Sequence, residues 1–136
     1  MVINQSTKPS PITVGVDIVA ISRLSKILVR FPQKFPRRIL TPCERLLLPE
    51  CFKAKVVFLA KRWAAKEALS KALGTGVGQR FSFQDASIFS RKKFKPKVEL
   101  SHTVIEHFMI EHCEISWSDE KDYVAAFCLL TLKKNT

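Results

Sequence analysis

Two carboxylates occupy positions where the sequence pattern predicts apolar side chains. Asp17 interrupts the strand-like run GVDIV at residues 15–19. Glu67 falls on the same helical stripe as Leu59 and Trp63, at the four-residue spacing of a buried face. A carboxylate taken out of water is costly unless it is hydrogen-bonded, ion-paired or bound to a metal. Mg²⁺ takes one or two protein carboxylates and fills its other positions with waters and phosphate oxygens. Together the two residues predict a Mg²⁺ site that serves phosphate chemistry.

Each carboxylate also has an ordinary structural interpretation. Glu67 and Lys71 are four residues apart, in the orientation that favours a solvated helix salt bridge worth a few tenths of a kcal/mol. Asp17 could accept a hydrogen bond from the turn that follows it, as a helix cap does. The spacing of these residues leaves both interpretations open beside the metal site.

Cations and glycines surround Glu67 along the chain. The helical pattern carries Lys61, Arg62, Lys66 and Lys71, and the run GTGVG at residues 74–78 follows it. Lysine, arginine and backbone N–H groups all suit phosphate oxygens. The run is not a P-loop, because it follows the helix and lacks the order GxxxxGK[ST]. For the glycines alone, a helix C-cap is the alternative to ligand binding.

The elements that must position these residues follow from periodicity and from strand and helix breakers. We expect a strand at residues 12–19, a helix from an N-cap at Ser22 to Phe31, and a short helix that begins with a capping box at Thr41. The longest helix is expected at residues 55–73. Further strands are expected at residues 81–83, 86–89, 97–100, 114–117 and 123–132, and a helix at residues 102–112. One domain over residues 12–136, with an N-terminal extension at residues 1–11, accommodates this order.

The positive charge lies in the first part of the chain. Residues 1–80 carry a net charge of +11, and residues 81–136 carry none. Arg23, Lys26 and Arg30 align on one side of the first predicted helix, which indicates a basic face for an anionic partner. A nucleic-acid-binding module would also need stacking aromatics among the cations, whereas Phe31 and Phe35 fit a core. A catalytically inactive interaction protein would have no need of Asp17 together with Glu67.

The chain has the features of a cytoplasmic protein. Its first residues lack the charged and apolar regions of an export signal, and no apolar run approaches the roughly 20 residues of a membrane helix. The four cysteines form no CxxC pair, and Cys113 and Cys128 lie inside apolar segments, as reduced core thiols do. We therefore expect no membrane contact and no disulfide.

Four segments resemble one enzyme family. They are GVDIV, the basic helix after it, RILTPCE at residues 38–44, and FLAKRWAAKEALSKALGTG at residues 58–76. Together they are similar to the holo-acyl-carrier-protein synthase family of phosphopantetheinyl transferases, over roughly residues 12–132. The resemblance implies an α+β fold with an antiparallel sheet packed against a long helix, in a homotrimer with active sites at subunit interfaces. It also implies Mg²⁺-dependent transfer of 4'-phosphopantetheine from coenzyme A, the co-substrate, to a serine of an acidic acyl carrier protein for fatty acid biosynthesis.

Position by position, the resemblance implies three groups of site residues. Asp17 and Glu67 match the family's metal-binding catalytic carboxylates. The residues that match its coenzyme A region are Lys61, Arg62, Lys71, Gly74, Thr75 and Gly76. The helix that receives the carrier protein is matched by Arg23, Lys26 and Arg30.

The chain departs from the family at two places. Many members have Ser-His near the last strands, where this chain reads SWSDE at residues 116–120, so no histidine contact to coenzyme A carries over. The family's Gly-Lys-Pro turn is replaced by Phe94-Lys95-Pro96. The resemblance leaves the general base and the replacement for the histidine near Asp119 unassigned.

Overall fold

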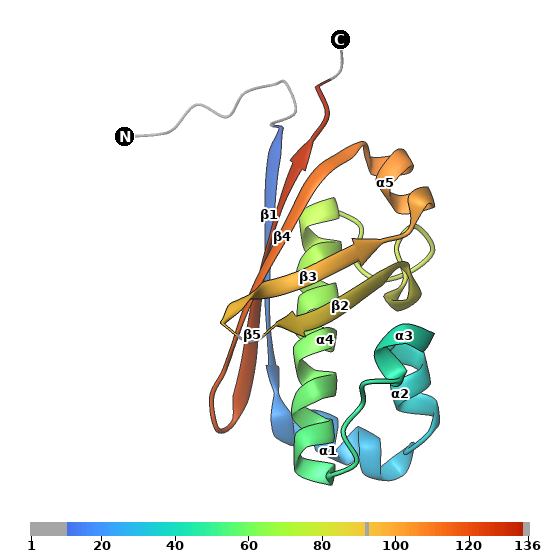
Figure 1. Ribbon diagram of the computed structural model, residues 1–136, viewed down its shortest axis with the longest axis vertical. Coiled ribbons are helices and arrows are strands. Elements are labelled where there is room, and N and C mark those ends of the chain that lie inside the picture. Colours follow the sequence, from blue (N-terminus) through green and yellow to red (C-terminus); the bar gives the residue numbers. More distant parts are fainter. Residues whose placement is uncertain (1–10, 92, 135–136) are drawn as a thin grey trace.

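The protein packs a three-stranded antiparallel sheet against one long helix, as shown in Figure 1 by a computed structural model that describes residues 11–91 and 93–134. In chain order the elements are β1 (Ile12–Ala20), α1 (Ile21–Arg30), α2 (Lys34–Ile39), α3 (Pro42–Arg45), α4 (Phe52–Leu73), the 3₁₀ helix η1 (Phe83–Asp85), β2 (Ala86–Arg91), β3 (Phe94–Leu100), α5 (His102–Phe108), β4 (Ile110–Asp119) and β5 (Tyr123–Leu132). The strand order of the larger sheet is β1-β5-β4, and β2 and β3 form a separate hairpin. The predicted α+β class, with an antiparallel sheet against a long helix, is confirmed.

Strand β1 alternates between two environments. Gly15 and Val19 are buried beneath α4, whereas Val16 and Ile18 on the opposite face are exposed. A Cβ atom at Gly15 would lie 2.0 Å from the carbonyl oxygen of Ala68. Glycine is therefore required for α4 to lie directly against the strand. Asp17 has the same parity as Gly15, so the alternation of the strand directs it toward α4.

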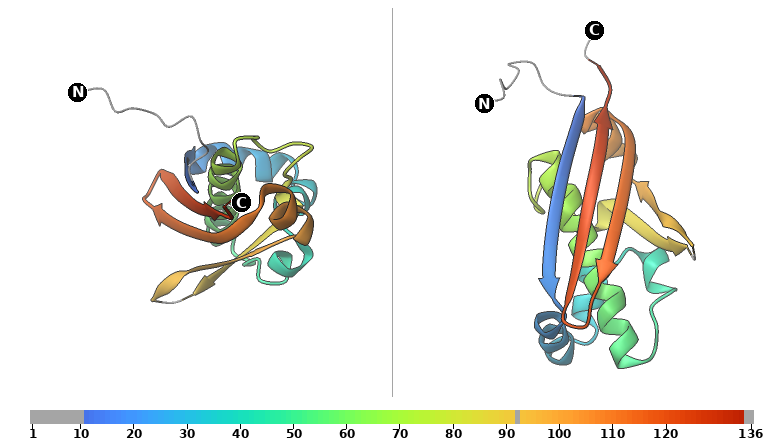
Figure 2. Two further views of the ribbon diagram at one scale, coloured as in Figure 1. Left: turned by 90° about the horizontal axis from the view of Figure 1, so that it is seen from above. Right: turned by 90° about the vertical axis from the view of Figure 1, so that its left-hand side faces the viewer.

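Helix α4 supplies more of the core than any other element. Its sheet-facing side is lined by small residues, including Ala64, Ala68 and Ala72, which allow the close approach to β1 and β5. The inward side chains of β5 complete this layer with Val124, Ala126, Cys128 and Leu130. Figure 2 shows α4 behind one face of the sheet, while the opposite face is open. Among the described residues no helix is long and apolar enough to cross a membrane.

The helices between β1 and α4 form a second small layer. Leu24 and Leu28 of α1 are buried, as are Phe35 and Ile39 of α2. The predicted capping box of α3 is confirmed, because the Thr41 hydroxyl accepts from the Glu44 N–H and the Glu44 carboxylate accepts from the Thr41 N–H. This box holds Glu44 in the interior, where it contacts α4.

Several predicted boundaries were wrong. Helix α1 has Ala20 at its N-cap instead of Ser22, because the strand continues directly into the helix. Residues 81–83 form no strand, since Ser82 and Asp85 make a local capping box that begins η1. Helix α4 begins at Phe52, three residues before the predicted start, and α5 ends at Phe108 because Met109 adopts the left-handed conformation. Residues 1–10 lie outside the described part of the chain, so the N-terminal extension stays a prediction.

Candidate active site at the seam between β1 and α4

Asp17 meets the last turn of α4 through Lys71. The Lys71 ammonium lies 3.0 Å from Asp17 Oδ1 and 3.0 Å from the carbonyl oxygen of Val16. The Asp17 side chain is only 16% exposed, whereas that of Lys71 is 53% exposed. Lysine 71 thus reaches across to β1, and the alternative of a local salt bridge with Glu67 is wrong. Helix α1 carries no side-chain cap among the described residues, so Asp17 does not serve as one.

Glu67 lies one turn before Lys71 on the same side of α4. Its pKa is raised from the ordinary 4.5 first by partial burial and then by the negative charge of Asp17, while Lys71 and Arg23 oppose the shift. Within the described residues, no hydrogen bond or ion pair reaches its carboxylate. A half-buried carboxylate beside a second carboxylate is an arrangement typical of functional sites. We call Asp17, Glu67 and Lys71 the seam cluster.

The seam cluster has the donor set of a hard cation. Two carboxylates provide oxygen ligands, and Glu67 lacks a protein partner that would compete for it. Nowhere in residues 11–91 and 93–134 do three or more His, Cys, Asp or Glu side chains converge as a metal cage. The protein therefore offers at most two carboxylates here, which suits Mg²⁺ with waters and substrate oxygens in its other positions.

A basic face adjoins the seam cluster. Arg23, Lys26 and Arg30 are exposed on α1, and Arg23 is close enough to affect the pKa of Glu67. The Arg23 guanidinium also lies 5.7 Å from the centroid of the Trp63 ring on α4. Helix α2 extends the face with Lys34, Arg37 and Arg38, next to an apolar cavity of about 400 Å³ that Phe31, Phe35 and Trp63 help to line. The predicted basic face is thus present beside the carboxylates.

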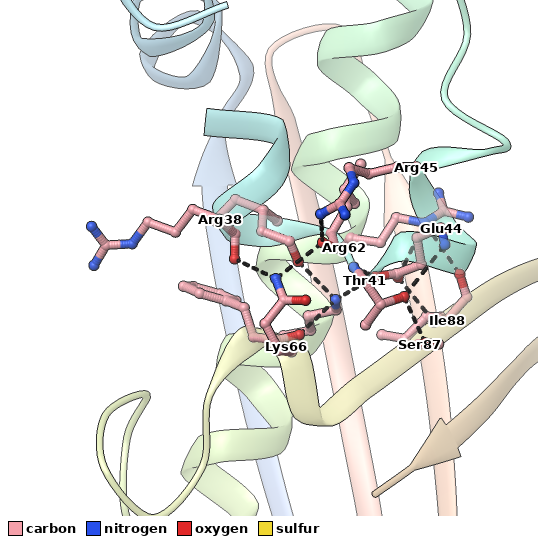
Figure 3. Close-up of polar contacts among 12 residues, drawn as sticks. Arg38, Thr41, Glu44, Arg45, Arg62, Lys66, Ser87 and Ile88 are labelled. Atoms are coloured by element: carbon pink, nitrogen blue, oxygen red, sulfur yellow. Dashed lines mark hydrogen bonds and ion pairs between the residues drawn. The ribbon is translucent and has the colours of Figure 1, made fainter. Parts of the chain in front are cut away.

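A second cluster of charges lies inside the protein, on another side of α4. Figure 3 shows Glu44 of α3 between Thr41, Lys66 and Ile88. The Lys66 ammonium donates to Glu44 and to the carbonyl oxygens of Ile39 and Phe83, at 2.7 and 2.9 Å for the two carbonyls. Glu44 also accepts from the N–H of Ile88. We call Glu44, Arg62 and Lys66 the buried cluster.

Arg62 is buried and bound by several protein groups. Its side chain is 2% exposed, Nε donates to the carbonyl oxygen of Ile88, and Glu44 lies 3.9 Å away. Burial lowers the pKa of Arg62 to about 10, and the charge of Glu44 opposes the shift. The guanidinium also lies 3.6 Å from the Phe58 ring centroid. These contacts fasten α4 to β2, and Arg62 also lines the cavity of about 430 Å³ that Lys61 and Phe58 line, so its predicted contact with coenzyme A stays a prediction.

Three comparisons with known proteins give the family. Residues 13–128 match the model of the 4'-phosphopantetheinyl transferase superfamily. The chain belongs to this superfamily. It is 39% identical to a holo-[acyl-carrier-protein] synthase of Photobacterium profundum, with 88% of this chain and 96% of the relative covered. With the synthase of Vibrio cholerae the identity is 44%, over 85% of this chain and 94% of the relative.

Solved structures of the superfamily have the same fold. The holo-[acyl-carrier-protein] synthase of Neisseria meningitidis superimposes with a TM-score of 0.79 at 39% identity, covering 87% of this chain and 96% of the other. The synthase of Helicobacter pylori, in complex with coenzyme A, gives a TM-score of 0.78 at 36% identity, with 87% and 99% covered. The predicted membership of the holo-acyl-carrier-protein synthase family is therefore confirmed.

Lys61 lies apart from the seam cluster. Its ammonium is 3.2 Å from Asp119 of β4 and 5.7 Å from the centroid of the Trp117 ring. Since β1 and β4 are the two outer strands of the sheet, Asp17 and Asp119 stand at opposite edges. Lys61 also lines a cavity of about 430 Å³ with Lys53 and Phe58. Within one chain, the predicted coenzyme A residues thus fall into two separate places.

The glycine run after α4 is a helix cap. Gly74 adopts the left-handed conformation, and its N–H donates to carbonyl oxygens of the last turn. The N–H groups of Thr75 and Gly76 donate to Ser70, and the Thr75 hydroxyl donates to the carbonyl of Gly76. The C-cap interpretation is therefore confirmed, and a role of this loop in binding phosphate stays a prediction.

Proposed function

We infer that this chain transfers 4'-phosphopantetheine from coenzyme A to a serine of apo acyl carrier protein, for fatty acid biosynthesis. The other product is adenosine 3',5'-bisphosphate. The match to the superfamily over residues 13–128 carries this conclusion, together with the names of relatives that are covered almost over their full length. The coenzyme A complex of the related Helicobacter pylori structure supports the same substrate.

We propose that Asp17 and Glu67 hold one Mg²⁺ ion in this reaction. The support is the seam cluster itself, in which Glu67 is half-buried with a raised pKa and without a hydrogen-bond partner among the described residues. When bound, Mg²⁺ would neutralise charge on the pyrophosphate oxygens during P–O cleavage. The two carboxylates would fix the position of the coenzyme A pyrophosphate relative to β1 and α4.

The lysine side chain of the seam cluster would also stabilise the negative charge that develops on the pyrophosphate oxygens. The carrier serine hydroxyl attacks the β-phosphorus of coenzyme A, and the P–O bond to the bisphosphate nucleotide breaks. Lys71 lies beside Asp17 and is half-exposed, so its ammonium can contact a phosphate oxygen without disturbing the core. Thr75 and the glycines Gly74 and Gly76 follow at the end of α4, where they would line the same substrate.

The basic face of α1 is proposed to receive the carrier protein. Arg23, Lys26 and Arg30 are exposed, and no acidic residue lies in the first turn of this helix. An acidic helix placed against these cations would be steered electrostatically and would bring its serine toward Asp17 and Glu67. The partner of this face is therefore an acidic protein, and nucleic acid is not required to explain the charge.

A homotrimer is proposed as the working assembly. The outer face of the sheet exposes apolar side chains of β1, which are 51–65% exposed: Ile12, Val14, Val16 and Ile18. Phe127 of β5 is 42% exposed. Contiguous apolar surface of this kind marks an interaction site. A neighbouring chain against this face could also join the Lys61 side of one protomer to the Asp17 side of another. Light scattering of the purified protein measures the number of chains.

A cytoplasmic location is proposed as well. All four cysteines are free thiols, and Cys128 is fully buried in the core. Reduced thiols of this kind are usual in cytoplasmic proteins.

Intact mass analysis tests the proposed function. The protein is incubated with coenzyme A, Mg²⁺ and apo carrier protein, and the carrier is weighed before and after the reaction. We expect a mass gain equal to one phosphopantetheine, which disappears when a metal chelator is present. An unmodified carrier at all enzyme concentrations would contradict the function, and transfer that persists with chelator would contradict the metal site alone.

A further inference from the structure

Lys71 is the protein cation that contacts Asp17 in the seam cluster. Its ammonium donates to Asp17 Oδ1 and to the carbonyl oxygen of Val16, both at 3.0 Å. Both acceptors belong to β1, an outer strand of the sheet. The contact therefore joins the C-terminal turn of α4 to the strand that carries the candidate metal ligand.

The two partners differ in exposure. The Asp17 side chain is mostly buried, at 16% exposed, so water reaches little of it, and the ammonium offsets part of its negative charge. Lys71 is 53% exposed and stands on a flexible stem in the last turn of the helix. Its ammonium can leave the carboxylate and remain in solvent, whereas Asp17 would then lose its side-chain partner among the described residues.

Within the described part of the chain, Glu67 has no cation in direct contact with its carboxylate. It lies four residues before Lys71, yet the ammonium contacts Asp17 across the seam instead of Glu67 on its own helix. Asp17 thus has a protein cation, while Glu67 has none among the described residues. A divalent ion that binds both carboxylates would share the Asp17 carboxylate with the ammonium on its Oδ1, and two cations on one carboxylate repel each other.

We propose that Lys71 is a resident cation that holds Asp17 until a divalent metal ion displaces its ammonium toward the phosphates of coenzyme A. This inference rests on the proposed metal site. It assigns Lys71 two successive positions: against Asp17 in the metal-free enzyme, and against the substrate in the loaded one. Because the phosphates offer the displaced ammonium a new partner, coenzyme A and metal should each strengthen the binding of the other.

The experiment measures the affinity of the protein for Mn²⁺ without coenzyme A. Electron paramagnetic resonance gives the concentration of free Mn²⁺ during the titration. Lys71→Met should bind Mn²⁺ at least ~10-fold more tightly than the wild type, because the competing charge is gone. Lys53→Met is the matched control, since it removes one exposed charge from the same helix about 27 Å along its axis, and should change the affinity less than twofold. Coenzyme A should increase the Mn²⁺ affinity of the wild type more than that of Lys71→Met.

The outcomes separate this inference from the proposed function. Asp17→Asn should lose Mn²⁺ binding, and binding as tight as wild type would refute the metal site itself. If Asp17→Asn loses binding while Lys71→Met binds no more tightly than Lys53→Met, the metal site stands and the resident cation is refuted. Lys71→Gln, which keeps a polar side chain without the charge, should repeat the result of Lys71→Met in case the latter fails to fold.

Discussion

Helix α4 contributes residues to two groups of charges, which differ in how many of their polar groups have a partner. In the buried cluster, the Lys66 ammonium has three acceptors and Glu44 is fully enclosed. In the seam cluster, Asp17 has one flexible cation and the Glu67 carboxylate has no hydrogen-bond partner in the described part of the chain. Lys66 and Glu67 are adjacent in sequence, yet they point about 100° apart around the helix and meet these different environments.

The difference indicates which group of charges is structural and which is reactive. Buried ions are tolerated where every donor and acceptor is matched, and such a group has no capacity left for a ligand. A half-buried carboxylate that lacks a partner is unfavourable in the free protein, and proteins retain such groups at functional sites. The cluster that contributes least to stability is therefore the one we assign to catalysis.

The largest effect is expected from breaking the buried cluster. Lys66→Met should lower the free energy of unfolding by about 3–5 kcal/mol, because it removes the ammonium that pairs with the buried Glu44 carboxylate and donates to two carbonyl oxygens. Urea denaturation followed by circular dichroism measures the loss. The double variant Glu44→Gln with Lys66→Met should be less destabilised than Lys66→Met alone, since the uncompensated charge is removed. Equal stability of Lys66→Met and wild type would contradict a structural role.

The seam cluster should respond in the opposite way. Asp17→Ala and Glu67→Ala should each lower turnover at least ~100-fold through lost positioning of the metal and substrate, with little change in unfolding free energy. Steady-state assays and melting curves of the same preparations measure the two quantities. Near-normal Mg²⁺-dependent transfer by both variants would remove the two-carboxylate site.

The basic face beside the seam cluster should affect association. Arg23→Glu combined with Arg30→Glu should raise the KM for carrier protein, mainly through slower and salt-sensitive binding, with a smaller effect on kcat. Kinetics at low and high ionic strength measure this dependence. Lys97→Glu, a charge reversal on β3 away from this face, serves as the control. An unchanged KM for the carrier at low salt would refute the docking face.

The smallest effect concerns the stability of the metal-free protein. Because the folded-state pKa of Glu67 is raised above 4.5, the folded protein keeps a proton that the unfolded chain has released, and stability falls as pH rises through this window. Glu67→Gln should therefore stabilise the protein at pH 7 by a few tenths of a kcal/mol, since solvent screens the partly exposed charge. Melting temperatures measured without metal at pH 7 and below 4.5 should show the gain only at the higher pH. A gain that is equal at both values would show that the charge is not its cause.

The sequence was informative where a residue broke a local pattern. Asp17 and Glu67 stand at apolar positions, and the structure brings them to the same seam because Gly15 allows α4 to approach β1. The predicted capping box at Thr41 was also a local pattern and was correct. Features of this kind can be predicted from the neighbouring residues and the period of the helix or strand alone.

The sequence did not predict the burial of charged side chains whose partners are backbone groups far away along the chain. Arg62 and Lys66 look like surface cations, because charged residues are exposed by default. Their burial depends on carbonyl oxygens of Ile39, Phe83 and Ile88, which no local pattern reveals. The ion-pair partner of Lys71 was equally hard to predict. The four-residue spacing favoured Glu67, whereas in the folded protein the ammonium contacts Asp17.

Anomalous diffraction from Mn²⁺ tests the central claim most directly. Crystals of the protein grown with coenzyme A and Mn²⁺ would be measured at the manganese absorption edge. We expect a single strong peak within bonding distance of carboxylate oxygens from both Asp17 and Glu67, next to the pyrophosphate. Ordered coenzyme A without a peak between these residues, or a peak on other side chains, would contradict the assignment of the seam cluster as the catalytic centre.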